Sequence, residues 1–231
     1  GDGNIFVTGA FYETAVFGDT SVVSSGGVDM YLSKFTAGGV PLWTVSGGGA
    51  SDAFGITDIG YSVTTDAQGN ALVTGKYFSS ASFGSYNLSA SGSESDIFIA
   101  QYSKDGKIDW IKSAGGVGKD VGYDVAISKL TGKIYVTGEF IGSATFGGTG
   151  INSTNGSTNT FVWILDQYGD MELVKYAGGG SLTTTRGRSL EINAEDDIYM
   201  IGNFYGNTTL HNTHLSTAPN SDDIFIWKVK L

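Results

Sequence analysis

The sequence contains no cysteine and only two prolines among its 231 residues. The absence of cysteine excludes a disulfide framework, a thiolate nucleophile and a cysteine-based metal site. Long apolar runs are missing as well, and none approaches the ~20 residues of a membrane-spanning helix, so we expect no membrane insertion. The opening segment GDGN resembles the middle of a β-turn, and we expect the chain to be a mature or excised piece of a longer protein.

Positive charge is also scarce. The chain has 13 Lys and Arg residues against 23 Asp and Glu residues, which gives a net charge of −10. Nucleic-acid binding needs clustered Lys and Arg, so the composition argues against a nucleic-acid partner and equally against an anionic membrane surface. Glycine is frequent, at 36 residues, and aromatic residues make up 13%. This combination is typical of an all-β protein with many tight turns.

One sequence pattern occurs four times at intervals of about 64 residues, and a fixed period of this kind indicates a repeat architecture. The copies are NIFVTGAF (4–11), NALVTGKY (70–77), KIYVTGEF (133–140) and DIYMIGNF (197–204). A complete unit predicts four short strands, at 122–128, 134–140, 160–166 and 171–177, joined by Gly- and Asp-containing turns. The third strand is almost continuously apolar, so we expect it to be covered on both faces. The recurring glycine after Val-Thr indicates close backbone packing between neighbouring units.

These features predict an all-β β-propeller built from four-stranded blades of about 64 residues. A β-sandwich is the alternative. The units are 1–57, 58–119, 120–184 and 185–231; the first lacks its first strand and the last lacks its fourth, which leaves about 3.5 blades. Raw sheet edges invite association, so three arrangements are open: a fragment of a longer ring, which we favour, a chain that pairs with a second copy, or an irregular four-bladed ring.

The repeat resembles the bacterial β-propeller repeat family, often called the seven-bladed or SBBP-type repeat. The resemblance covers essentially the whole chain and implies a propeller fold in a secreted or cell-surface bacterial protein, with no defined activity. Asn159 and Leu173 depart from the pattern, as does the loss of Phe-Gly in the last unit. The matching residues are Asp96, Phe98, Ala100, Tyr102, Gly106, Trp110, Gly115, Gly116, Asp120, Gly122, Tyr123, Ala126 and Gly132 through Phe140.

Repeated acidic residues raise the possibility of calcium. Asp29, Asp96 and Asp223 each precede a third strand, but Asn159 occupies the same position in the other unit. Calcium sites usually supply several oxygen ligands at short spacing, and such runs are absent here. We therefore interpret these residues as caps on local backbone N–H groups, with calcium as the weaker alternative, and expect no cofactor.

The two histidines, His211 and His214, form an H-N-T-H segment that would need a third ligand to hold zinc. We expect them to be solvated polar residues on a variable connection. No Ser-His-Asp set or convincing carboxylate pair suggests catalysis, so the sequence predicts no enzyme.

The candidate binding residues come from the propeller geometry. The first strand of each unit would line the central channel, so the residues that enter it would surround the axis. Tyrosine rings together with carboxylate acceptors suit sugar or peptide recognition. The sequence therefore predicts an axial ligand-binding face made of Asp58, Tyr61, Asp120, Tyr123, Arg186 and Arg188.

We expect a non-catalytic binding or adhesion scaffold, extracellular or on the cell surface, that recognises a protein or a glycan. A propeller glycoside hydrolase or polysaccharide lyase is one alternative. The other is a purely structural spacer or assembly module, which would associate with itself or continue in a longer chain to close the ring.

Overall fold

The structure is a computed structural model that describes residues 3–50, 57–154 and 156–230. The described part of the chain is all-β, as the composition predicted, with strands β1 to β20 and no helix. The strands form sheets of five, six and nine strands, and nearly all strand pairs are antiparallel.

The five-stranded sheet has the order β1-β2-β3-β6-β7 and consists of β1 (Ile5–Phe17), β2 (Thr20–Phe35), β3 (Pro41–Gly48), β6 (Ser80–Phe83) and β7 (Tyr86–Ser89). The six-stranded sheet has the order β13-β12-β9-β8-β5-β4 and consists of β4 (Ile59–Thr65), β5 (Ala71–Tyr77), β8 (Asp96–Tyr102), β9 (Ile108–Gly116), β12 (Ser143–Phe146) and β13 (Thr149–Asn152).

The nine-stranded sheet consists of β10 (Val121–Ile127), β11 (Ile134–Ile141), β14 (Thr158–Leu165), β15 (Met171–Gly179), β16 (Thr184–Ile192), β17 (Ile198–Tyr205), β18 (Asn207–Leu210), β19 (Thr213–Ser216) and β20 (Asp222–Val229). It has two parts, and β14 joins β16 through the parallel residue pair Thr158 and Thr184. The chain thus contains four strand groups: the N-terminal group (β1, β2, β3), the second group (β4, β5, β8, β9), the third group (β10, β11, β14, β15) and the C-terminal group (β16, β17, β20).

The sheets are larger than the four-stranded units that the repeat predicted. The segment between the second and third strand of a unit, expected to be a plain connection, forms a short hairpin. Hairpin β6-β7 pairs with β3, β12-β13 with β9, and β18-β19 with β15. Each hairpin therefore extends the sheet of the preceding group, and the groups interlock along the chain.

The recurring glycine lies at a close backbone approach within its own unit. A Cβ atom built on Gly75 would lie 1.8 Å from the carbonyl oxygen of Ile59, and one on Gly138 would lie 1.8 Å from that of Val121. Both contacts join neighbouring strands of the same sheet. The close packing expected between units is also present at Gly75, since its carbonyl oxygen would lie 3.3 Å from a Cβ atom built on Gly122 of the next unit.

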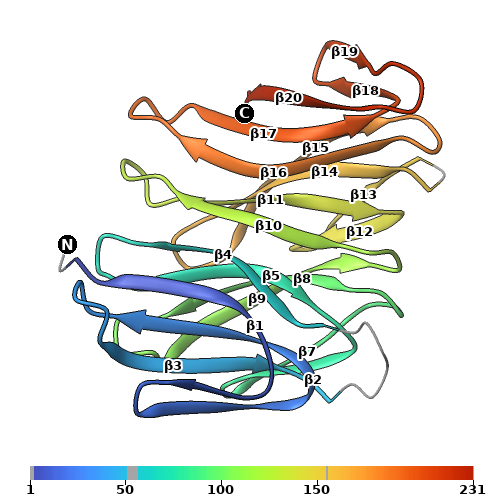
Figure 1. Cartoon of the computed structure of the whole chain (residues 1–231). Helices are drawn as coiled ribbons and strands as arrows, with labels where there is room; N and C mark the ends of the chain where they lie inside the picture. Colours follow the sequence, from blue (N-terminus) through green and yellow to red (C-terminus); the bar gives the residue numbers. More distant parts are fainter. Residues whose placement is uncertain (1–2, 51–56, 155, 231) are drawn as a thin grey trace.

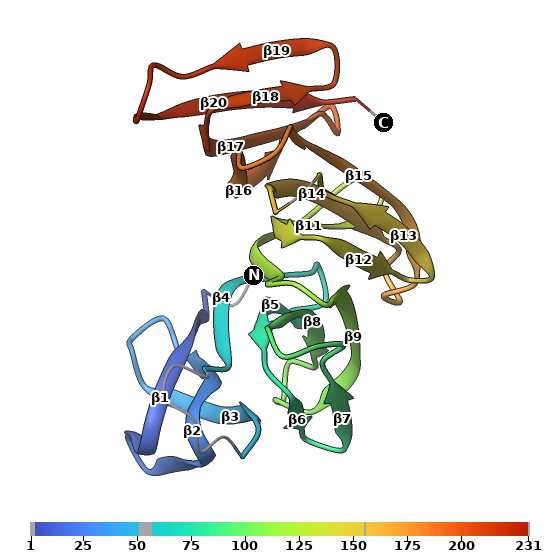
Figure 2. The ribbon, with the colours of Figure 1, turned by 90° about the vertical axis from the view of Figure 1, so that its right-hand side faces the viewer.

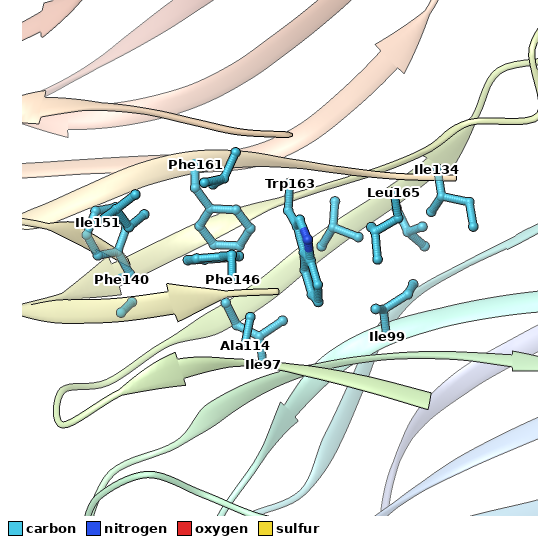
Figure 3. Close-up of a cluster of buried hydrophobic side chains, with 14 of the residues drawn as sticks. Ile97, Ile99, Ala114, Ile134, Phe140, Phe146, Ile151, Phe161, Trp163 and Leu165 are labelled. Atoms are coloured by element: carbon cyan, nitrogen blue, oxygen red, sulfur yellow. The ribbon is translucent and has the colours of Figure 1, made fainter. Parts of the chain in front are cut away.

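Figures 1 and 2 show the four groups following one another along an arc, with the N-terminal group and the C-terminal group at its two ends. The core lies between successive groups. In the largest cluster, Ile97 and Ile99 of the second group face Trp163 and Leu165 of the third (Figure 3). The third strands are covered on both faces in the middle of the chain, where every residue of β14 is buried. In β20, by contrast, exposed and covered residues alternate over much of the strand.

Candidate functional site

The strands β4, β10 and β16, here called the inner strands, hold equivalent places in three successive groups, and each contacts the next. Each has one break in its pairing register, between Gly60 and Ser62, Gly122 and Asp124, and Gly187 and Ser189. The extra residue at each break is a β-bulge, which re-aims its side chain and leaves it outside the regular ladder. The three bulge residues are Tyr61, Tyr123 and Arg188.

The bulge residues meet in one cluster, although 62 or more residues separate them along the chain. The rings of Tyr61 and Tyr123 lie edge to face, with centroids 5.4 Å apart. The Arg188 guanidinium lies over the Tyr123 ring, 4.7 Å from its centroid. Tyr61 is 41% exposed and Arg188 is also exposed, whereas Tyr123 is half-buried between them. An aromatic pair and a cation–π pair each contribute about 1 kcal/mol. These contacts hold the three side chains together, while Tyr61 and Arg188 stay open to solvent.

A buried carboxylate, that of Glu139, contacts Tyr123 of the cluster. Glu139 is buried and forms ion pairs with Lys119, at 2.7 Å, and Arg186, at 2.5 Å. Burial alone would raise the pKa of Glu139, but the hydrogen bond and charge of Lys119 and the charge of Arg186 lower it below its usual value. Glu139 therefore stays ionised. Arg188 is fixed in turn, because its Nε donates to Asn203 Oδ1 at 2.9 Å.

Both tyrosines remain neutral phenols. Burial raises the pKa of Tyr61, and the nearby Glu139 carboxylate raises it further. The pKa of Tyr123 is raised by the same two causes. The Tyr61 hydroxyl thus keeps a proton to donate to a ligand, whereas the Tyr123 hydroxyl donates its proton to Glu139.

Asp58 and Asp120 do not join this cluster. Asp58 accepts the N–H groups of Gly49, at 2.9 Å, and Phe78, at 2.8 Å. Asp120 accepts those of Gly116, at 2.8 Å, and Ile141, at 3.3 Å. Both carboxyl groups are almost fully buried. They tie the connection that enters an inner strand to the end of the following strand, and they take no surface position.

Burial dominates the pKa values of these two carboxyl groups. It raises the pKa of Asp58 to about 6 and that of Asp120 to about 8, against the lowering effect of the backbone N–H groups. A second buried carboxyl adds to each shift, Asp29 beside Asp58 and Asp96 beside Asp120. The two pairs lie across Gly48 and Gly115, where an added Cβ would meet both carboxyl groups of each pair within 3.0 Å.

The repeated acids before the third strands act as caps where they are buried. Asp29 accepts the N–H of Ser25 at 2.7 Å, and Asp96 accepts that of Ser91 at 2.9 Å. Asp223 is exposed at the C-terminal group. Among residues 3–50, 57–154 and 156–230, no group of three or more His, Cys, Asp and Glu side chains is placed to hold a metal ion. His211 and His214 are exposed, and His214 Nδ1 pairs with Thr209 Oγ1 at 2.8 Å.

A second link between the inner strands could not be predicted from the repeat pattern. Asp124 accepts the hydroxyl groups of Ser62 and Ser189, both at 2.6 Å, and the N–H of Leu190 at 2.9 Å. One carboxylate thereby joins β4, β10 and β16 beside a groove of about 680 Å³. Lys119, Glu139 and Asn203 were missed as well, since none of these residues recurs at its position in the other copies of the repeat.

The described residues contain no helix that is long and apolar enough to cross a membrane. A scan against models of known protein families finds no match to the chain. A search of curated proteins finds no significant match either.

Proposed function

We propose that the chain is a β-propeller segment that acts as a non-catalytic binding or adhesion scaffold, secreted or on the cell surface, and that the bulge cluster of Tyr61, Tyr123 and Arg188 binds its protein or glycan partner. The observation that carries the proposal is that three successive inner strands present their bulge residues at one point. Four similar groups along an arc, each leaning on the next through apolar faces, support the propeller assignment.

The charges around the cluster favour an acidic partner. Lys76, Lys119, Arg186 and Arg188 gather near Glu139. Burial lowers the pKa of Lys76 and the charge of Lys119 lowers it further, against the opposite effect of Asp58, Glu139 and Glu94. These four cations lie close together in a chain whose net charge is −10. Aromatic edges and a guanidinium plane suit a sugar ring that carries a carboxylate or sulfate, or an acidic peptide.

The enzymatic alternative receives less support from the geometry. A glycosidase needs two carboxyl groups that flank the substrate. Asp58 and Asp120, the acids expected at the axis, are buried and accept backbone N–H groups. Asp58 and Asp120 therefore hold the connections that enter β4 and β10, and they do not flank a substrate.

The test is a binding screen of the chain against neutral oligosaccharides, uronic-acid and sulfated oligosaccharides, and an acidic peptide. Tyr61→Ala and Arg188→Ala should each weaken binding of the acidic probes about tenfold or more, since a loss of 1.4 kcal/mol corresponds to a factor of ten. Arg188→Lys should recover part of the loss, because it keeps the charge without the planar guanidinium.

Tyr168→Ala is the matched control. Tyr168 is 67% exposed and lies in a turn away from the cluster, so its removal should leave binding unchanged. Binding that survives both Tyr61→Ala and Arg188→Ala would exclude the bulge cluster as the site. Turnover of a polysaccharide that disappears in Asp120→Asn, with the variant still folded, would favour the enzymatic alternative.

A further inference from the structure

The C-terminal group exposes an apolar face that its counterparts bury. Tyr199 and Ile201 of β17 are 36% and 50% exposed, and Ile224 and Ile226 of β20 are 82% and 73% exposed. Ile201 lies opposite Ile226 in the strand register, so these side chains form one continuous surface. The equivalent residues are at most 2% exposed; they are Leu72, Thr74, Ile97 and Ile99 in the second group and Tyr135, Thr137, Thr160 and Val162 in the third.

The next group along the chain covers this face wherever it is buried. Ile97 and Ile99 pack into one core cluster with Ile134 and Val136 of the third group (Figure 3). Val162 of the third group packs in the same way into a cluster with Met200 and Phe225 of the C-terminal group. The covering surface therefore comes from the second and third strands of the following group, and we call this contact a junction.

The N-terminal group exposes the matching half of a junction. Ile5 is 47% exposed and Val7 is 38% exposed. The residues in these two positions of the later groups are at most 1% exposed, and they are Ala71 and Val73, Ile134 and Val136, and Ile198 and Met200. Figure 1 shows that the N-terminal group and the C-terminal group lie at opposite ends of the stack of groups.

The strand edges at the two ends are also open. In the described part of the chain, β20 pairs only with β17, and β1 pairs only with β2. In the first unit the ring centroids of Phe17 and Tyr31 lie 5.0 Å apart. The equivalent rings of the second unit, Phe83 and Phe98, lie 4.9 Å apart, so the hairpin packs on its own unit in the same way. Later hairpins pair with a preceding group, whereas the first exposes Val16 and Val23 by 68% and 65%.

We propose that the C-terminal group binds the N-terminal group of a second copy of this chain, head to tail, and that this contact repeats the internal junction. The two faces are halves of an interface that the chain already forms three times, so neither needs a new partner surface. The contact is heterologous, and two copies joined by two such junctions would close, whereas a mismatch of the arc would give longer assemblies. The proposal is independent of the ligand at the bulge cluster.

Analytical ultracentrifugation across micromolar concentrations tests the proposal. The wild-type chain should sediment above its monomer mass of 24.2 kDa. Ile226→Glu and Val7→Glu should each abolish closed dimers, because each places a charge in one half of the junction. An equimolar mixture of the two variants should form a heterodimer, since each retains the half that the other has lost.

Leu130→Glu is the matched control, because Leu130 is 69% exposed in a turn of the third group, away from both faces. It should assemble as the wild type does, and circular dichroism should show that all three variants keep their strands. A wild-type chain that stays monomeric would overturn the proposal. So would assembly that Ile226→Glu abolishes and Val7→Glu does not, since that result indicates a symmetric contact between two C-terminal groups.

Discussion

Asp120 illustrates how a residue can recur in a repeat without serving a ligand. Its two carboxyl oxygens hold the N–H groups of Gly116 and Ile141, and Asp96 lies beside it. At the next junction Asn159 and Thr185 occupy the same two positions, and Thr185 pairs with Thr208 Oγ1 at 2.6 Å. A neutral pair with other hydrogen-bond partners thus takes this place at one junction, which indicates that the fold does not require a charge there.

The raised pKa values predict that stability falls as the pH rises. Asp120 and Asp58 have pKa values of about 8 and about 6 in the folded chain, against 3.8 as the ordinary value. The folded state therefore binds these protons more tightly, and the stability they contribute is complete below about pH 4 and is lost as the pH rises through the folded values. We expect the free energy of unfolding in urea to fall by a few kcal/mol, in order of magnitude, between pH 5 and pH 9.

The variant Asp120→Asn should flatten this pH dependence, because the amide keeps an acceptor oxygen and does not ionise. Asp105→Asn, at an exposed turn, should leave the slope as in the wild type. Glu139 acts in the opposite direction, but only on the acid side of its ordinary value of 4.5. An Asp120→Asn chain with the full wild-type slope would contradict the assignment.

At the scale of the element, the bulge explains the glycine that follows Val-Thr in the repeat. The bulge moves the carbonyl group of Val121 against Gly138, and that of Ile59 against Gly75. A side chain at either glycine would need the two strands to separate. Gly9 is the informative exception, because β1 pairs on one side only and an added Cβ would meet just the Tyr31 ring, at 3.0 Å.

Gly138→Ala should therefore destabilise the chain far more than Gly9→Ala. Overpacking of a fixed site costs about 1–3 kcal/mol or more, and the backbone carbonyl at Gly138 has little room to move. For Gly9→Ala we expect less than about 1 kcal/mol, because a side-chain ring yields more readily. Urea unfolding of the two variants measures the difference, and equal losses would show that the bulge carbonyl is not the constraint.

Local patterns predicted the all-β class, the principal strands and the buried third strands, because turn residues and continuous apolar runs act over short distances. The hairpins escaped prediction since β6 and its equivalents are four residues long and pair with a preceding group. Tyr61 and Tyr123 were placed together correctly, whereas Asp58 and Asp120 were not. Their carboxyl groups turn towards backbone N–H groups that come close only after the sheets have formed.

At the scale of the whole molecule, each group contacts its neighbours in three ways. Apolar faces meet in the core clusters, and hairpins extend the preceding sheet. In addition, a turn glycine rests on a tryptophan of the preceding group, Gly106 on Trp43 and Gly169 on Trp110. Leu173 occupies the tryptophan position in the third group and is 37% exposed. Contacts limited to neighbours make stability a sum over groups and their interfaces.

Phe146 tests this view of the molecule. It lies in a hairpin on the second group and contacts Phe161 and Trp163 of the third, at centroid distances of 4.8 and 5.4 Å (Figure 3). Phe146→Ala should cost about 3–5 kcal/mol and raise hydrogen exchange on both sides of that junction. Phe17→Ala, at the equivalent but partly exposed position of the first unit, should cost less. If Phe146→Ala raises hydrogen exchange only in the hairpin itself, the junction does not depend on Phe146.

The bulge in each inner strand also has an evolutionary consequence. A residue outside the ladder is free of the pairing constraints on its neighbours, and each of the three units with an inner strand contributes one such residue to the same spot. Duplication of a unit would thus add one more independently variable position to a shared surface. Specificity could then diversify through single codons spaced one repeat apart, while the scaffold that presents them stays constant.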